Sequence, residues 1–228
     1  MIKPDIVYIL GTGSRWNNNE LKYSLRSIEK HLTNYENIYL IGEKPAWTQN
    51  VIHLPHPDLS KISDVNQYMK LLRAAIDPTI SANFLMAHDD HFLLSDFEAN
   101  NFPNFHKEPL IECKRYDPYG KRVKNTEQYL KLKGYPTLNF DVHTPILFNK
   151  SAWLESVHKA NWKEESYVIK SLYANQQEIN YIRIDDCKIY RTKDIEGKSI
   201  ISTYPNPSNE IKQFLKEKFP NKSRYEAN

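Results

Sequence analysis

The sequence predicts an α/β fold in which a mostly parallel central sheet is flanked by helices. Three observations carry this prediction. Short apolar runs of strand length alternate with segments whose apolar residues recur at helical spacing. The links between them are short, which is typical of right-handed crossovers between parallel strands. The length of 228 residues is enough for one large domain with a core of its own.

The first strand and helix follow from the opening residues. Asp5–Leu10 is a short, largely apolar run closed by Gly11–Ser14, which predicts a buried strand that runs into a turn. A helix is expected next, because four apolar residues repeat at helical spacing and the asparagines at 17–19 offer a cap. Those four residues are Leu21, Leu25, Ile28 and Leu32.

The same rhythm continues to residue 90. Asn37–Gly42 and Val51–Leu54 predict two more strands, and the spacing of Val65, Met69, Leu72 and Ile76 predicts a second helix whose apolar stripe faces the sheet. A strand over Asn83–Ala87 follows. Because parallel strands end at the same edge of a sheet, we expect the residues after the first strand and Asp89–Asp90 to face one cleft.

The second half is less regular. The stretch from Lys114 to Lys133 has little apolar periodicity and predicts a mobile basic loop, which either contacts a phosphate or an acceptor or is a solvated surface insertion. A buried strand is expected over Ile146–Phe148, and a helix capped by Ser208 is expected to end before Pro220. The basic residues of the loop are Lys114, Arg115, Lys121, Arg122, Lys124, Lys131 and Lys133, and the apolar stripe of the last helix is Ile211, Phe214, Leu215 and Phe219.

Composition excludes several classes. The two cysteines, Cys113 and Cys187, form no CxxC pair and have no histidine cluster beside them, so the sequence suggests neither a zinc knuckle nor a disulfide framework. No apolar run approaches the roughly 20 residues that span a bilayer, and the N-terminus does not resemble a signal peptide. A soluble cytoplasmic protein is therefore expected. The net charge of +3 is a weak argument for a polyanionic partner.

The most informative motif is His88-Asp89-Asp90-His91, at the end of an apolar strand. Adjacent carboxylates repel each other unless a cation lies between or beside them, so Asp89 and Asp90 are candidate ligands of Mg²⁺ or Mn²⁺. Such an ion often bridges a carboxylate to a diphosphate. The alternative is a strand-end turn with two solvated acids. His91 either joins the metal or, by alternation along the strand, faces away from it.

Four blocks of the chain, in order, resemble conserved regions of the Stealth proteins, which are sugar-phosphate transferases. The arrangement is also similar to glycosyltransferases of the GT-A type, in which an acidic pair holds a metal ion and the nucleotide diphosphate. This resemblance implies a single GT-A-like, Rossmann-like domain over 1–228, with a donor-binding half (1–100) and an acceptor half (101–228). The four blocks are Asn18–Lys30 with Ile38–Ile41 and Pro45–Trp47, then Phe84–Leu93, Asp141–Pro145 and Phe219–Glu226.

Two departures from the Stealth pattern bear on the reaction. Thr12 stands where those proteins carry an aspartate, and Trp16-Asn17 stands where they carry Arg-Asp. We therefore predict glycosyl transfer, a metal-dependent movement of a sugar from a nucleotide-diphosphate sugar to a glycan or other hydroxyl acceptor. The alternatives are a sugar-1-phosphate transferase, a non-catalytic binding module, and a phage-type enzyme that glycosylates DNA bases through the basic Lys114–Lys133 segment.

Individual roles follow from side-chain chemistry. Residues 11–14 combine small side chains with backbone N–H groups just before a helix, which suits the close approach of a nucleotide, although a turn that requires glycine explains them equally well. Arg15 and Lys70 are candidate phosphate contacts. Asp141 or His143 is the candidate base for the acceptor hydroxyl, and His143 alternatively completes the metal shell or has a structural role. The predicted donor-binding residues before the helix are Gly11, Thr12, Gly13 and Ser14.

Overall fold

A computed structural model describes residues 3–160, 162, 166–177 and 180–227. The chain divides into two compact units. Unit 1 comprises Met1–Phe102, His143–Leu147 and Cys187–Asn228, and unit 2 comprises Pro103–Val142 and Phe148–Asp186. The first boundary falls close to the predicted division at residue 100, and the C-terminal segment belongs to unit 1. The assignment of donor and acceptor roles to the two halves stays a prediction.

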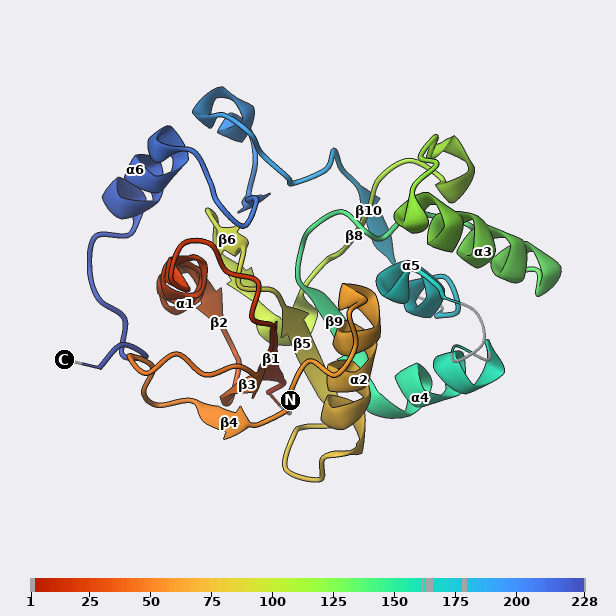
Figure 1. Cartoon of the computed structure of the whole chain (residues 1–228), viewed down its shortest axis with the longest axis horizontal. Coiled ribbons are helices and arrows are strands. Elements are labelled where there is room, and N and C mark those ends of the chain that lie inside the picture. Colours follow the sequence, from red (N-terminus) through yellow and green to blue (C-terminus); the bar gives the residue numbers. More distant parts are fainter. Residues whose placement is uncertain (1–2, 161, 163–165, 178–179, 228) are drawn as a thin grey trace. The chain divides into compact units, whose positions relative to one another are not determined.

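A five-stranded sheet has the order β4-β3-β1-β5-β9 (Figure 1), and its first four strands form the centre of unit 1, whereas β9 begins in unit 1 and ends in unit 2. The pairs β1–β3, β1–β5 and β3–β4 are all parallel, which confirms the predicted mostly parallel sheet. All six residues of β1 are buried, as expected for a strand with neighbours on both sides and helices on both faces. The strands are β1 (Asp5–Leu10), β3 (Ile38–Gly42), β4 (Ile52–Leu54), β5 (Asn83–Ala87) and β9 (Ile146–Asn149).

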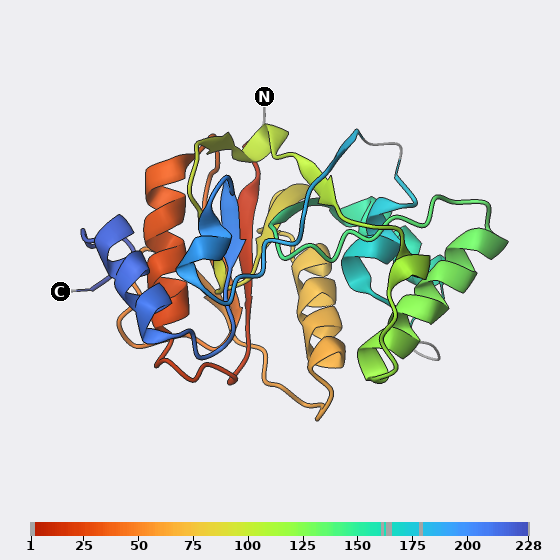
Figure 2. The same cartoon turned by 90° about the horizontal axis from the view of Figure 1, so that it is seen from above.

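Helices α1 (Asn19–His31) and α2 (Ser63–Ile76) cover opposite faces of this sheet (Figure 2). The chain moves outward from β1 to β3 through α1 and returns across the sheet from β4 to β5 through α2. Right-handed crossovers in opposite directions place their helices on opposite faces, so the arrangement agrees with the handedness rule.

The start of α1 differs from the predicted asparagine cap. Asn18 occupies the cap position with a left-handed backbone (φ 55°), and its side chain makes no capping hydrogen bond. The hydroxyl of Ser14 instead accepts hydrogen bonds from the backbone N–H groups of Trp16 (3.3 Å) and Asn18 (2.8 Å). The hydroxyl of Ser14, which lies outside the helix, therefore orders the turn. Asn18 contributes by tolerating the left-handed backbone conformation. The predicted stripe is buried, with Leu32 lying just past the helix.

The predicted buried face of α2 is wrong. Met69 is 40% exposed and Ile76 is 59% exposed, while Val65 and Leu72 are half-buried, so the stripe read from the sequence is not the buried face. The buried face instead carries Leu71, Ala74 and Ala75 with the polar-tipped side chains of Tyr68 and Lys70. Small alanine side chains allow the helix backbone to lie close to the sheet, and this close packing decides the face over bulk hydrophobicity.

The remaining elements of unit 1 form a second layer beside α1. A core cluster of Phe92, Ile201 and Leu215 joins β6, β11 and α6, and Ser208 caps α6 as predicted by accepting the Ile211 N–H (3.3 Å). The additional elements are β2 (Leu32–Thr33), β6 (His91–Leu93), β7 (Phe97–Glu98), η1 (Ala99–Asn101), η3 (Thr192–Ile195), β11 (Ile200–Ser202) and α6 (Asn209–Lys218).

Unit 2 corrects the prediction of a mobile basic loop, because most of that stretch is the helix α3 (Pro118–Leu132). Asp117 caps it by accepting the Gly120 N–H (3.0 Å), and Pro118 occupies the first turn. Polar Thr126 and Glu127 occupy buried positions between Val123 and Leu130, which hides the helical period from a hydrophobicity pattern. Its other elements are β8 (Asn104–His106), η2 (Leu110–Glu112), α4 (Lys150–Lys159), α5 (Ile169–Ala174) and β10 (Tyr181–Arg183).

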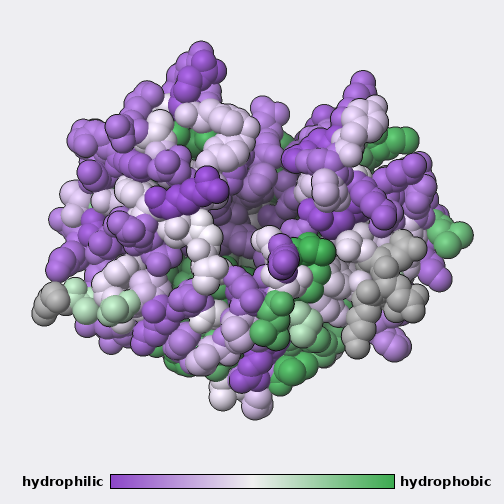
Figure 3. All heavy atoms as spheres, in the orientation of Figure 1, coloured by the Kyte–Doolittle hydropathy of each residue, from purple (hydrophilic) through white to green (hydrophobic). Residues whose placement is uncertain are grey.

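The face drawn in Figure 3 is mostly hydrophilic, in keeping with a mean hydropathy of −0.68. Within the described residues, no helix combines the length and the apolar character needed to cross a membrane.

Candidate functional site

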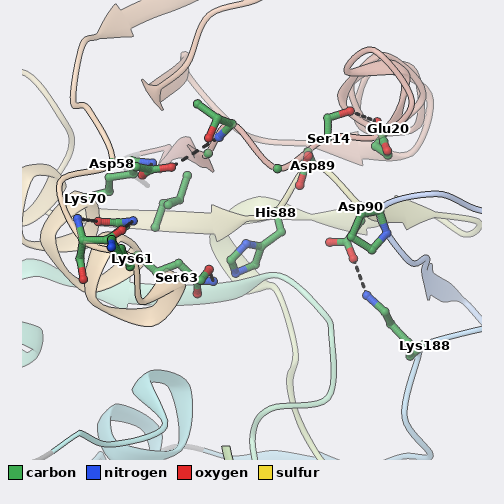
Figure 4. Close-up of a pocket in the computed structure, with 18 residues that line it drawn as sticks. Ser14, Glu20, Asp58, Lys61, Ser63, Lys70, His88, Asp89, Asp90 and Lys188 are labelled. Atoms are coloured by element: carbon green, nitrogen blue, oxygen red, sulfur yellow. Dashed lines mark hydrogen bonds and ion pairs between the residues drawn. The ribbon is translucent and has the colours of Figure 1, made fainter. Parts of the chain in front are cut away.

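A cavity of about 570 Å³ opens in unit 1 at the carboxyl ends of β1 and β5. Three segments supply most of its lining: the loop Gly11–Ser14 after β1, residues between Asp58 and Lys70 that lead into and along α2, and His88–Asp90 after β5 (Figure 4). Ile9, Glu20, Lys188 and Pro205 complete it. The predicted convergence of the glycine loop and the acidic pair on one cleft is confirmed. It follows from the pairing of β1 with β5, which brings Tyr8 opposite Ala87 near the ends of both strands.

Asp89 is a carboxylate in an unfavourable place. Burial, together with the charges of Asp90 and Glu20, raises the pKa of Asp89 to about 7. Lys188 partly opposes this effect. A carboxylate held under these conditions is stabilised by any cation that enters the cavity, because the ion offsets both the lost hydration and the repulsion.

Asp90 has a different environment from that of its neighbour. The ammonium of Lys188 and the hydroxyl of Ser202 both donate to its Oδ2, each at 2.8 Å. Burial alone would raise the pKa of Asp90, but Lys188 and the imidazoles of His91 and His88 outweigh it and hold that pKa below its ordinary range. The pair therefore consists of one compensated carboxylate and one that lacks an ion-pair partner in the described chain.

His91 belongs to the support of the pair and is 3% exposed. Its Nδ1 accepts the backbone N–H of His88 (3.3 Å), and its Nε2 lies 4.0 Å from Oδ1 of Asp90. His91 does not line the cavity, whereas His88 does. This placement agrees with the predicted alternative in which His91 faces away from the ligand side.

Glu20 is a cavity residue that the sequence analysis missed. Its Oε2 accepts the hydroxyl of Ser14 (2.8 Å), and burial raises its pKa. It lies in the first turn of α1, where a negative charge interacts favourably with the helix N-terminus. Together with Asp89 and Asp90 it gathers three carboxyl groups on one side of the cavity, whose lining also includes Lys61, Lys70 and Lys188 (Figure 4).

Lys70 and Asp58 form an ion pair at the other side of the cavity (Figure 4). The Lys70 ammonium donates to Oδ1 of Asp58 and to the backbone carbonyl of Leu10, both at 2.5 Å, and the lysine is 2% exposed. Asp58 also accepts the N–H of Thr12 (3.4 Å). The structure therefore places Lys70 in the wall that holds the glycine loop, and a phosphate contact for it stays a prediction.

The backbone of the glycine loop distinguishes the two explanations of its glycines. Neither Gly11 nor Gly13 has a positive φ, so the turn itself does not require glycine at either position. A Cβ on Gly13 would meet no atom within 4 Å. Gly13 therefore leaves open space beside the cavity, which favours close approach of a ligand, whereas a Cβ on Gly11 would lie 3.0 Å from Oδ2 of Asp58. Arg15 is exposed, is not among the residues lining the cavity, and donates its N–H to the Pro205 carbonyl (3.3 Å).

The two candidate bases fall in different units. Asp141 belongs to unit 2, where its Oδ2 accepts the hydroxyl of Tyr119 (2.8 Å) and its Oδ1 lies 4.0 Å from the ammonium of Lys170. His143 belongs to unit 1 and has a left-handed backbone (φ 55°). Neither lines the cavity of unit 1, and the role of each as a base stays a prediction.

Within the described residues, no group of three or more His, Cys, Asp and Glu side chains is placed to hold a metal ion alone. Mg²⁺ commonly binds through one or two carboxylates and completes its shell with water and substrate phosphates. Asp89, with Asp90 beside it, fits that donor set, because Asp89 has no ion-pair partner in the described chain and Oδ2 of Asp90 is already engaged by Lys188.

No protein-family model and no curated protein gives a significant match to the chain. Among solved structures, the chain is similar to the galactosyltransferase LgtC, determined in complex with donor and acceptor sugar analogs. The TM-score is 0.55, the sequence identity is 10%, and the similarity covers 96% of each chain. The fold is therefore a GT-A-like α/β fold, as predicted. The resemblance to Stealth proteins stays a prediction.

Proposed function

We propose that this protein is a metal-dependent glycosyltransferase that moves a sugar from a nucleotide-diphosphate sugar to a hydroxyl acceptor. The observation that carries the proposal is the cavity at the ends of β1 and β5. It joins the glycine loop, the acidic pair and Lys188, which are the groups needed to bind a diphosphate and its counterion. The fold similarity to LgtC, a galactosyltransferase solved with donor and acceptor sugar analogs, supports the same reaction class.

Mg²⁺ or Mn²⁺ bound beside Asp89 and Asp90 would supply Lewis-acid stabilisation of the charge that develops on the departing diphosphate. The side chains of the protein have separate roles. Asp89 provides the carboxylate without an ion-pair partner in the described chain, and Ser202 and Lys188 hold Asp90 in place through Oδ2. Rigid placement of this kind costs no reorganisation at the moment of reaction.

Lys188 and the glycine loop bind the diphosphate directly in this proposal. The ammonium of Lys188 lines the cavity, where it lies 2.8 Å from Oδ2 of Asp90 and 3.4 Å from the Ser202 hydroxyl, so a phosphate that enters there meets its positive charge. The loop Gly11–Ser14 brings backbone N–H groups to the cavity without side chains in the way at positions 11 and 13. Together they offset negative charge on the side of the leaving group.

The test is a thermal-shift screen of nucleotide diphosphates and nucleotide sugars, with and without Mn²⁺. A ligand that binds only the folded protein raises its melting temperature. We expect a shift with one nucleotide class that needs the metal ion. Absence of any shift across UDP-, GDP- and TDP-linked sugars contradicts the proposal. Phosphorus NMR of the product then separates glycosyl transfer from sugar-1-phosphate transfer, since only the latter keeps a phosphate on the product.

The predicted DNA acceptor has its own test. Lys121 and Lys124 lie on α3 of unit 2, a helix that presents basic side chains to solvent. Binding of duplex DNA through such residues falls steeply as salt concentration rises. A salt-insensitive or absent association with duplex DNA leaves a glycan or another hydroxyl compound as the acceptor.

A further inference from the structure

Two tyrosines form an aromatic pair in unit 1, outside the set of residues assigned above. The ring centroids of Tyr190 and Tyr204 are 4.5 Å apart with an interplanar angle of 38°, and the hydroxyl of Tyr204 donates to that of Tyr190. Tyr190 is 65% exposed. Tyrosine offers a large, rigid surface with a polar tip at low entropic cost, which is why it is frequent at binding surfaces.

The pair is linked to the cavity by one side chain. The ammonium of Lys188 lies 4.9 Å from the ring centroid of Tyr204 and 2.8 Å from Oδ2 of Asp90. Lys188 lines the cavity, and so does Pro205, the residue after Tyr204. The aromatic pair is therefore continuous with the rim of the cavity, on the side of the acidic pair that Lys188 occupies.

The backbone that carries the pair is held in place. Ile189, directly before Tyr190, is fully buried and donates its N–H to the carbonyl of Ser202 (2.9 Å). The N–H of Tyr190 donates to Oδ2 of Asp194 (3.1 Å). A surface that is already ordered loses little conformational freedom on binding, which favours affinity for small ligands.

We propose that the exposed ring of Tyr190, backed by Tyr204, is the subsite that binds a pyranose ring of the acceptor. A pyranose has an apolar C–H face that packs on an aromatic ring, while its hydroxyls hydrogen-bond at the edge, where the tyrosine hydroxyls lie. The proposal rests on the proposed function. That function places the diphosphate of the donor at Asp89 and the glycine loop, and Lys188 lies between those groups and the tyrosines, so the pair faces the second substrate.

The experiment measures binding of methyl pyranosides by saturation-transfer difference NMR, in the absence of nucleotide and metal. The probes are the methyl glycosides of glucose, galactose, mannose and N-acetylglucosamine. We expect at least one to bind the parent protein and Tyr190→Phe, which keeps the ring. Tyr190→Ala should weaken its binding about tenfold, while a matched loss of a fully exposed ring, Tyr116→Ala, should leave it unchanged.

Three outcomes overturn the inference. The first is that no methyl pyranoside binds the parent protein. The second is that Tyr190→Ala binds the pyranoside as well as the parent does, at an unchanged melting temperature. The third is that Tyr190→Ala weakens the binding of UDP or GDP in the presence of Mn²⁺, which assigns the ring to the base of the donor. If the proposed function fails instead, nucleotide binding by the parent protein is absent while Tyr190-dependent sugar binding persists.

Discussion

The ammonium of Lys188 lies 2.8 Å from a carboxylate oxygen of Asp90, although the two residues are 98 positions apart in the chain. The contact joins the turn after β5 to the segment that precedes β11. The positive charge of Lys188 offsets the negative charge of Asp90, whereas Asp89 has no equivalent ion-pair partner in the described chain. This difference between two adjacent aspartates is the basis of the first two predictions.

Replacing Lys188 by alanine should weaken nucleotide-diphosphate binding about tenfold when measured by calorimetry in the presence of Mn²⁺, because one charge-assisted hydrogen bond is lost. Lys188→Arg keeps the positive charge and serves as the matched control. Equal nucleotide affinity of the alanine variant and the parent protein would mean that Lys188 contacts Asp90 but not the diphosphate.

Asp89→Asn and Asp90→Asn should both abolish metal-dependent turnover, yet only Asp90→Asn should lower stability. Removing the charge of Asp89 relieves its repulsion with Asp90, so the melting temperature of the Asp89→Asn protein should stay level or rise. Removing that of Asp90 leaves Lys188 without its partner, and the melting temperature should fall by several degrees. EDTA should silence the parent enzyme and Mn²⁺ restore it. Turnover that survives in both variants excludes the acidic pair as the metal site.

Gly13→Ala should leave the melting temperature unchanged, since nothing lies within 4 Å of the added carbon, but should lower donor affinity if a phosphate approaches the loop. Gly42→Ala is the contrasting variant. Gly42 has a φ of +113°, and a Cβ there would lie 2.0 Å from the Leu10 carbonyl oxygen, so we expect strong destabilisation. Normal donor affinity in a stable Gly13→Ala protein would favour a purely structural loop.

The two candidate bases are separated by comparing Asp141→Asn with His143→Gln. Loss of a true base lowers kcat by roughly 10²- to 10⁴-fold with little change in donor affinity. Tyr119→Phe is the control for Asp141, because it removes the hydrogen bond to Oδ2 and leaves the carboxylate. If both variants keep the kcat of the parent protein, the base lies elsewhere or the reaction proceeds without one.

The Arg26–Glu226 ion pair should give the protein an acid-sensitive component of stability. Burial by itself would raise the pKa of Glu226, but the hydrogen bonds from Arg26, at 2.7 Å, and from the N–H of Ser223 outweigh it and lower that pKa. A lowered carboxyl pKa in the folded state stabilises the protein above the unfolded-state value, about 4.3 for glutamate, and this contribution is lost as pH falls.

Glu226→Gln should therefore lower the free energy of unfolding by about 3 kcal/mol at pH 7, as expected for breaking a buried pair, and the difference from the parent protein should shrink below pH 4. Urea titrations at pH 7, 5 and 3.5 measure it. A difference that is constant with pH would assign the effect to packing.

The sheet could be predicted because β1, β3 and β5 are short apolar runs, and local composition is enough to identify such runs as strands. The helix α3 could not be, since its buried positions include Thr126 and Glu127, and burial of those residues depends on tertiary contacts. The buried face of α2 was also predicted wrongly, because it too depends on tertiary contacts. Hydrophobicity favoured Met69 and Ile76, whereas close packing on the sheet selected Ala74 and Ala75.

Some residues of the candidate site could likewise be predicted from the sequence, and others could not. Asp89 and the glycine loop were found because each directly follows a strand, so their place at the sheet edge follows from the fold. Glu20 and Lys188 were missed, because nothing local marks them. The one available signal for Glu20 is its position in the first turn of a helix that follows a glycine loop. Lys188 carries no such signal, since its role depends on the distant pairing of Lys188 with Ser202 and Asp90.

The C-terminal segment is joined to the early part of the chain by backbone pairing. Thr48 bridges Glu226, the N–H of Gln49 donates to the Tyr225 carbonyl, and the N–H of Ala227 donates to the Trp47 carbonyl. Unit 1 also includes all of Cys187–Asn228, whereas unit 2 ends at Asp186. During synthesis every residue of unit 2 therefore leaves the ribosome before unit 1 is complete. The second layer beside α1, where Tyr23 and Phe92 pack with Ile211 and Leu215, is therefore assembled only after Cys187–Asn228 has been made, and until then these apolar side chains lack part of their cover.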